Sequence, residues 1–259
     1  MTETIDFSKS EQYTLSIRLS ADGFSFSVLN PLENDAPWIE HHAIDESLSL
    51  TANLKRIYRE VEWLSLPYRR VNVLSAGKRF TFIPLDFFED EQAELVFYHN
   101  LPPRENEQVL YNILHASNVV VLFGIDKTAY AFLQEKHPQV RFYSHTTPLI
   151  EYFSSKSRLG NTRKMYVNLR KETADVYCYE RNRLLLANTY PCTVTADRIY
   201  YLLYIWKQLE LDQERDELHL SGILEEKELL LSELRKYVRQ VFIMNPAENI
   251  DLYAIHQCE

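Results

Sequence analysis

Hydrophobic and polar positions alternate in two short runs near the start of the chain. The first run covers residues 13–19, and the second places Phe24, Phe26 and Val28 on one face. Residues 21–23 separate the runs and contain Asp22-Gly23, a pair that is typical of a hairpin turn between alternating segments. We therefore predict that the chain opens with a β-hairpin.

The rest of the first half mixes strand and helix patterns. Alternating or continuous apolar runs predict strands at residues 38–44, 71–75, 80–83, 109–114, 119–123 and 140–143. Helical spacing or a helix-starting residue predicts helices at residues 50–64, 86–100 and 126–133 and from Thr147-Pro148 onward. We expect 71–75 and 80–83 to form a hairpin through Gly77, and 109–114 to pair with 119–123.

A polar, basic segment separates the two halves of the chain. Residues 154–164 read SSKSRLGNTRK, with Leu159 as the only large apolar side chain. Such composition is typical of a linker between domains. We therefore expect an N-terminal lobe at residues 1–155, with an inserted subdomain around 65–115, and a C-terminal lobe at 156–259.

The second half restarts with strands in the same way as the first. Three strands, expected as a meander, are predicted at residues 165–169, 174–179 and 184–190. They are followed by a helix at 195–209, a strand at 217–221, a long helix carrying Leu230 to Val241 on one side, and a strand at 241–244 that stops at Asn245-Pro246. This repetition predicts a duplicated α/β lobe with mixed sheets and flanking helices, although the spacing alone fits several such folds.

Charge and composition exclude several classes of function. The net charge of −9 gives an acidic surface that repels phosphate backbones, so we expect no nucleic-acid partner. We also expect no membrane span and no signal peptide, because no run of 18 apolar residues occurs and the first residues lack a basic start. Cys178, Cys192 and Cys258 follow no CxxC spacing, which disfavours a disulfide framework. Together these features favour a cytoplasmic protein.

Glycine and histidine usage argues against common cofactor sites. The chain has 5 glycines, whereas average usage would give roughly 18. Phosphate-binding loops need glycine where the backbone approaches an anion closely. His41 and His42 are adjacent and would face opposite sides of a strand, and no metal-ligand spacing occurs elsewhere. We therefore predict no metal, no cofactor and no catalytic residue.

Four short stretches resemble the actin-like ATPase superfamily, and in particular the family of the pilus-assembly protein PilM. They are residues 118–127, 165–177, 218–224 and 241–246. The chain is also similar to a bacterial family, designated a domain of unknown function, that shares this fold. The resemblance implies a two-lobed actin-like (ribonuclease H-like) α/β fold and no particular activity.

The same resemblance shows where the nucleotide loops depart from the family. Asn168 stands at the second phosphate-loop aspartate and Arg170 at its glycine, while Arg18 stands where the first loop has its acid. Gly222 keeps one glycine of the adenosine loop, and Ile223 replaces the next. Magnesium prefers carboxylate oxygens to a neutral amide, so the resemblance implies that the metal-binding chemistry has been lost.

Two functions from different classes follow for the vestigial cleft candidates Arg18, Asn168, Arg170, Thr173 and Gly222. In the first, they belong to a pseudo-ATPase that acts as a non-enzymatic scaffold, and the resemblance to PilM implies a protein or peptide partner. In the alternative, Arg18, Arg170 and Lys171 bind phosphate directly in an ATPase or nucleotide sensor with a rearranged site. A third possibility is an assembly subunit, although the sequence predicts no oligomeric state.

Two surface features bear on a partner. The run Glu89-Asp90-Glu91 is typical of a solvated helix start, and a face for a basic partner is the sharper alternative. Tyr200, Tyr201, Tyr204 and Trp206 crowd one helix, where aromatic residues usually belong to the core. Tyrosine and tryptophan are also enriched at protein interfaces, so both interpretations stay open.

Overall fold

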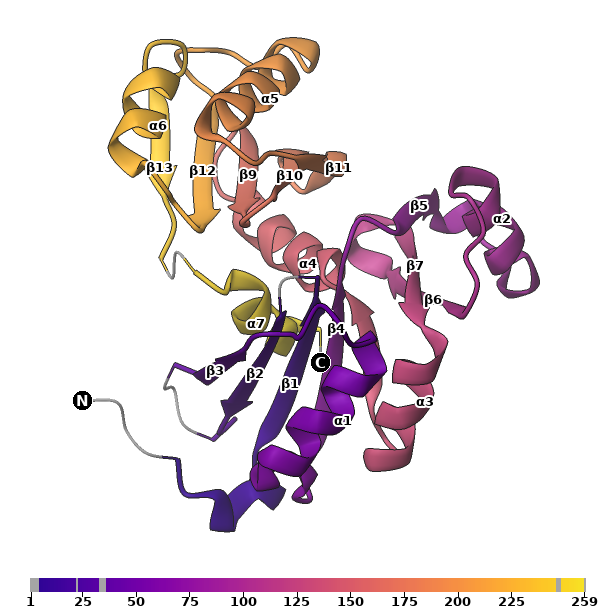
Figure 1. The fold of residues 1–259 in the computed structure, drawn as a ribbon. Helices are drawn as coiled ribbons and strands as arrows, with labels where there is room; N and C mark the ends of the chain where they lie inside the picture. The colour runs from indigo at the N-terminus through magenta and orange to yellow at the C-terminus, as the bar shows by residue number, and fades with distance from the viewer. Residues whose placement is uncertain (1–4, 22, 33–35, 246–247, 259) are drawn as a thin grey trace. The chain divides into compact units, whose positions relative to one another are not determined.

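The computed structural model describes residues 5–21, 23–32, 36–245 and 248–258 (Figure 1). Asp22 in the predicted first turn and Pro246 after the predicted last strand lie outside the described residues. The chain divides between Pro148 and Leu149 into two compact units. Among the described residues, no helix combines the length and the apolar character that a bilayer crossing requires.

The first unit is built on a five-stranded mixed sheet of order β3-β2-β1-β4-β8. Its strands are β1 (Thr14–Ser20), β2 (Gly23–Leu29), β3 (Trp38–His42), β4 (Arg70–Ala76) and β8 (Arg141–Ser144). The predicted opening hairpin is confirmed, because β1 and β2 pair antiparallel from Thr14–Leu29 to Ser20–Gly23. β4 then pairs parallel with both β1 and β8.

Two helices bury their apolar faces against one side of this sheet. They are α1 (Leu50–Glu60) and α3 (Lys127–Lys136). Ser49 and Asp126 cap them by accepting hydrogen bonds from backbone N–H groups of the first turn. Leu54 and Leu133 pack with Ile17 of β1 in one core, and none of the three has exposed surface. The apolar faces of the helices and of the strand therefore form a single buried layer.

A smaller three-stranded sheet of order β5-β7-β6 is inserted between β4 and β8. Its elements are β5 (Phe80–Pro84), the 3-10 turns Leu85–Phe87 and Asp90–Gln92, α2 (Ala93–Asn100), β6 (Glu107–Leu114) and β7 (Val119–Asp126). The predicted pairing of 109–114 with 119–123 is confirmed by the antiparallel β6–β7 ladder. The predicted helix over 86–100 is shorter, because Leu85 and Phe88 pack onto the small sheet and leave only the last eight residues helical.

The hairpin predicted from 71–75 and 80–83 is wrong. β4 lies inside the large sheet, whereas β5 pairs antiparallel with β7 in the small one. Val73 and Leu74 are both fully buried, as expected of an interior parallel strand that is covered on both faces. A short gap containing Gly77 looks the same in sequence whether the chain turns back or crosses into another sheet.

The second unit is built on a sheet of order β11-β10-β9-β12-β13. Its strands are β9 (Arg163–Leu169), β10 (Thr173–Glu180), β11 (Arg183–Pro191), β12 (Glu217–Gly222) and β13 (Gln240–Ile243), and its helices are α4 (Thr146–Ser157), α5 (Thr195–Gln208), α6 (Lys227–Leu234) and α7 (Ile250–Ala254). The predicted meander of β9, β10 and β11 is confirmed. α5 and α6 share a core with Val167 on one face of β9, while Phe153 of α4 stacks on Tyr166 of the other face.

Two boundaries in this unit differ from the sequence prediction. α4 continues to Ser157, whose hydroxyl donates to the carbonyl of Ser154 inside the helix, so the polar segment is partly helical. α6 ends at Leu234, well before Val241, which belongs to β13. Val238 is buried although it follows the helix, and this burial explains why the apolar spacing looked continuous.

The two large sheets have the same topology. In each, the first strand pairs antiparallel with the second and the second with the third, and two parallel strands follow on the other side. A helix connects the third and fourth strands of both sheets. The predicted duplication of an α/β lobe is therefore confirmed.

Candidate functional site

A row of polar side chains crosses the first three strands of the second unit, on the face opposite α5 and α6. Asn168 of β9, Asp175 of β10 and Thr189 of β11 are direct neighbours in the strand ladders. The Asn168 amide donates to Asp175 Oδ2 at 3.2 Å, and the Thr189 hydroxyl donates to Asp175 Oδ1 at 2.8 Å. Both oxygens of a fully buried carboxylate therefore accept hydrogen bonds from their own sheet.

Arg170 extends this row into a buried ion-pair bridge. Its Nε donates to Asp175 Oδ2 at 2.9 Å, and its Nη2 lies 3.4 Å from Asp251 Oδ2, on α7. The side chains of Asp175 and Asp251 are 0% and 1% exposed, and that of Arg170 is 17% exposed. One guanidinium thus links two carboxylates that water barely reaches. We call this arrangement, Asp175–Arg170–Asp251, the arginine clamp.

The electrostatics of the clamp favour the charged arginine. Burial alone would lower the pKa of Arg170, but the carboxylates of Asp175 and Asp251 outweigh it and raise that pKa. Tyr177 follows Asp175 by two residues on β10 and is fully buried. Its burial, and to a smaller extent the charge of Asp175, raise the pKa of its hydroxyl well above the ordinary value. The Tyr177 hydroxyl has no hydrogen-bond partner among the described residues, and its raised pKa makes it a neutral neighbour of the clamp.

Arg198 of α5 supports the turn that carries Arg170. Its Nη2 donates to the Arg170 carbonyl at 3.1 Å, and its side chain is 1% exposed. The same Nη2 atom lies 3.8 Å from Glu225 Oε2. The turn is closed by a backbone hydrogen bond from the Arg170 N–H to the Thr173 carbonyl at 2.8 Å. Thr173 therefore contributes its backbone to this turn.

Gly222 has a structural explanation. It ends β12 directly opposite Leu169 of β9, with a φ of +88°. A Cβ atom there would lie 2.0 Å from the Leu169 carbonyl oxygen and 2.6 Å from its nitrogen. The next residue, Ile223, donates its N–H to the same carbonyl at 2.7 Å. The glycine is required by the close approach of two strands and a left-handed backbone.

Arg18 occupies, in the first unit, the position that Asn168 occupies in the second. Arg18, Ser25 and His41 are ladder neighbours on β1, β2 and β3, with the same seven-residue spacing across the hairpin as Asn168 and Asp175. Arg18 Nη2 donates to Ser25 Oγ at 2.8 Å, and Ser25 Oγ lies 2.8 Å from His41 Nδ1. Each unit thus carries a hydrogen-bonded polar row at one register, with an arginine in the first unit where the second has Asn168.

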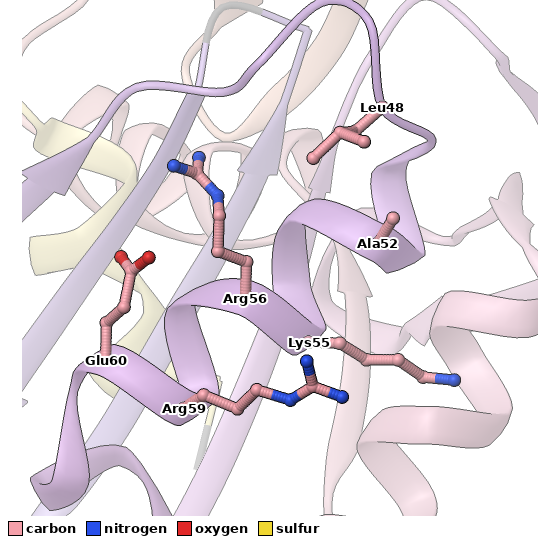
Figure 2. A pocket seen from close by; sticks show the side chains of 6 residues that line it. All are labelled: Leu48, Ala52, Lys55, Arg56, Arg59 and Glu60. Atoms are coloured by element: carbon pink, nitrogen blue, oxygen red, sulfur yellow. The ribbon is translucent and has the colours of Figure 1, made fainter.

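A shallow hollow of about 500 Å³ over α1 is a separate feature (Figure 2). It is lined by Leu48, Ala52, Lys55, Arg56, Arg59 and Glu60. Two of its three cations serve the packing of the unit itself: Arg56 donates to the Ala43 carbonyl and to Asn53 Oδ1, and Lys55 lies over the Phe132 ring. The hollow is therefore a groove along one helix without a converging set of free groups.

The residues at the expected position of the second phosphate loop do not fit a hydrated magnesium ion. The two carboxylates that α7 and β10 bring together already share a guanidinium, and a second cation there would be repelled by Arg170. The other two side chains of the row, Asn168 and Thr189, are neutral and donate to Asp175. Among the described parts of the chain, no group of three or more His, Cys, Asp or Glu side chains is arranged to hold a metal.

The duplicated sheets, each with two antiparallel and two parallel pairings, define the actin-like class of fold. Residues 2–241 match the family described as "Protein of unknown function (DUF3822)", and the chain belongs to that family. It is 62% identical to a Bacteroides thetaiotaomicron protein whose crystal structure has an actin-like ATPase fold and unknown function. That match covers 99% of this chain and 100% of that one, with a TM-score of 0.92.

More distant structures share the fold alone. The PilM of a PilM–PilN type IV pilus biogenesis complex matches with a TM-score of 0.56 at 11% identity, over 90% of this chain and 88% of that one. The ethanolamine utilization protein EutJ from Carboxydothermus hydrogenoformans matches with a TM-score of 0.52 at 10% identity, over 95% and 89% of the two chains. A comparison with curated proteins finds no match. The expected resemblance to the actin-like fold, to PilM and to a family of unknown function is confirmed.

The structure brings together only part of the predicted residue set. Asn168 and Arg170 meet at Asp175, the Thr173 backbone closes their turn, and Gly222 lies beside Leu169. Arg18 belongs to the polar row of the other unit. Three contributors were missed. Asp251 and Arg198 reach Arg170 from α7 and α5, and Thr189 reaches Asp175 from β11; no local motif distinguishes any of them.

Proposed function

We propose that this protein is a non-enzymatic scaffold of the cytoplasm, an actin-like pseudo-ATPase that binds another protein or a peptide. The arginine clamp carries the proposal. In the actin-like ATPase family a loop aspartate at this point serves hydrated magnesium. Here that position is Asn168, and the two nearby carboxylates, Asp175 and Asp251, pair with Arg170. Fold alone does not carry function, so the argument depends on these residues.

The protein-binding half of the proposal is supported by how this fold is used elsewhere. The PilM of similar fold is part of a complex with PilN. On the surface of this chain, Tyr200 and Tyr204 of α5 are 62% and 49% exposed and stack on each other, whereas Trp206 of the same helix is buried. Exposed aromatic side chains of this kind are common at protein interfaces.

The alternative is an ATPase or nucleotide sensor in which Arg18, Arg170 and Lys171 bind phosphate directly. The clamp disfavours this function, because Arg170 would have to give up two buried carboxylates to reach an anion. Lys171 is exposed and lies in the same turn, so it is the residue that a phosphate would contact first.

A thermal-shift screen with ATP, ADP and GTP, each with magnesium, separates the two functions. A ligand at one hundred times its Kd adds about 2.7 kcal/mol of stability, which is a shift of several degrees for a chain of this size. We expect no shift for the wild type and none for Lys171→Ala. A rise of several degrees that Lys171→Ala abolishes would establish the alternative and overturn the proposal.

A further inference from the structure

Two large apolar side chains of the small inserted sheet point away from its core. Phe87 and Leu95 are 75% and 71% exposed. Their neighbours behave differently: Phe88 packs onto the cluster of the small sheet, and Phe97 is fully buried in it. The chain therefore has a core to which Phe87 and Leu95 contribute nothing, and folding gives no reason for their apolar character.

The strand β6 carries two further part-exposed apolar side chains. Tyr111 and Ile113 are 37% and 40% exposed and lie on the same face of β6 as Val109, which packs against the cluster under α2. The Tyr111 ring lies 4.9 Å from that of Phe88. β6 is an edge strand of the sheet β5-β7-β6, and the exposure of Tyr111 and Ile113 shows that this face is only partly covered.

The segment that carries Phe87 and Leu95 is acidic, and we call its exposed carboxylates the acidic rim. Asp86, Glu89, Asp90, Glu91 and Glu94 are all exposed, and residues 84–100 contain no lysine or arginine. None of these five carboxylates forms an ion pair with a cation in the described parts of the chain; the contacts that they make are with the neutral side chains of Asn118, Gln92 and Tyr111. We call the four exposed apolar side chains and these carboxylates the β6–α2 patch.

We infer that the β6–α2 patch docks a basic amphipathic segment of a partner protein, with its apolar side chains on Phe87, Leu95, Tyr111 and Ile113 and its lysines or arginines on the acidic rim. The inference rests on the protein-binding function proposed above and names the chemistry of the partner. Opposite charges across an interface speed association and exclude wrong partners. The same rim repels an anionic lipid surface or a nucleic-acid backbone, which leaves a cationic protein segment as the occupant.

The test measures binding of a fluorescein-labelled amphipathic helix made of leucine and lysine to the full chain, by anisotropy at low and at high salt. We expect saturable binding that weakens with salt, because the rim charges are exposed and screened. The variant Phe87→Ser/Leu95→Ser should bind about tenfold more weakly, which is the loss of roughly 1.4 kcal/mol typical of an apolar anchor. Glu91→Lys/Glu94→Lys should weaken binding at low salt by at least as much. All four positions are exposed, so circular dichroism should show unchanged folding.

Leu229→Ser/Tyr237→Ser is the matched control. These two side chains are 48% and 52% exposed, and Leu229 lies beside another acidic run that contains Glu228. Its binding should stay within about twofold of wild type. Equal weakening in the control, no effect of Phe87→Ser/Leu95→Ser, or no binding at low salt would each overturn the inference. So would a wild-type dimer in sedimentation that Phe87→Ser/Leu95→Ser abolishes, since the occupant would then be a second copy. A nucleotide-induced thermal shift overturns the proposed function alone and leaves these binding results to be judged separately.

Discussion

Removing the guanidinium of Arg170 is the sharpest perturbation of the second unit. In Arg170→Ala, Asp175 and Asp251 would keep their burial, at 0% and 1% exposure, and lose the cation that lies between them. Breaking a buried ion pair by deleting one partner costs about 3–5 kcal/mol, because the remaining charge is left without compensation. The apparent Tm should fall by roughly 6–20 °C for a chain of this length.

The measurement is urea unfolding followed by circular dichroism, with Lys171→Ala as the matched control. Lys171 is the exposed neighbour of Arg170 in the same turn, and its removal should change the free energy of unfolding by less than about 0.5 kcal/mol. The triple variant Arg170→Met/Asp175→Asn/Asp251→Asn removes all three charges, and replacing a whole buried ion set with uncharged groups is often close to neutral. It should recover at least half of the loss.

Two results would refute the reasoning about the clamp. The first is an Arg170→Ala protein whose free energy of unfolding is within about 1 kcal/mol of wild type, since an unpaired buried carboxylate costs more than that. The second is a triple variant no more stable than Arg170→Ala, because the loss would then come from packing around the arginine and not from the two uncompensated charges.

Three further predictions follow from buried groups elsewhere. Burial, helped by Lys136, lowers the pKa of His137 from 6.5 to about 4. The stability that the neutral imidazole contributes is therefore complete above pH 6.5 and is lost as the pH falls toward 4. Between pH 7 and 4.5 the wild type should lose about 2 kcal/mol more free energy of unfolding in urea than His137→Gln, and equal losses would contradict this. Gly222→Ala should lower the free energy of unfolding by at least about 2 kcal/mol. The added Cβ would lie 2.0 Å from the Leu169 carbonyl oxygen, at a φ of +88°. An unchanged Tm in calorimetry would contradict the structural role of this glycine. Cys178 and Cys192 are both fully buried, and burial raises the pKa of the Cys178 thiol. A thiol-reactive dye should therefore label neither cysteine in the native protein and both in urea. Rapid labelling of Cys178 in the native protein would disprove its burial.

The repeated strand openings were readable from the sequence because they depend on local patterns. Alternation at residues 13–19 and an Asp-Gly turn specify a hairpin, and the meander of β9, β10 and β11 has the same kind of signal. The exit of the chain from β4 had no such signal. Gly77 is compatible with a turn back or with a crossover, and only the burial of β4 on both faces decides between them.

The candidate site was predictable only where neighbours in sequence are neighbours in space. Asn168 and Arg170 lie on one hairpin, so a single short stretch placed these two candidates together. Asp251 is 81 residues from Arg170, and Arg198 reaches the same turn from the first turn of α5. The expected departure from the family's nucleotide loops rests on single residues, whereas the clamp depends on Asp251, which the packing of α7 supplies.

A calorimetric titration of the wild-type protein with ATP in excess magnesium tests the central claim most directly. With Arg170 paired to both Asp175 and Asp251, we expect no saturable heat at any ATP concentration up to the millimolar range. A saturable isotherm with micromolar affinity and a requirement for magnesium would show that the clamp opens to a nucleotide, and it would contradict the assignment of this protein as a pseudo-ATPase.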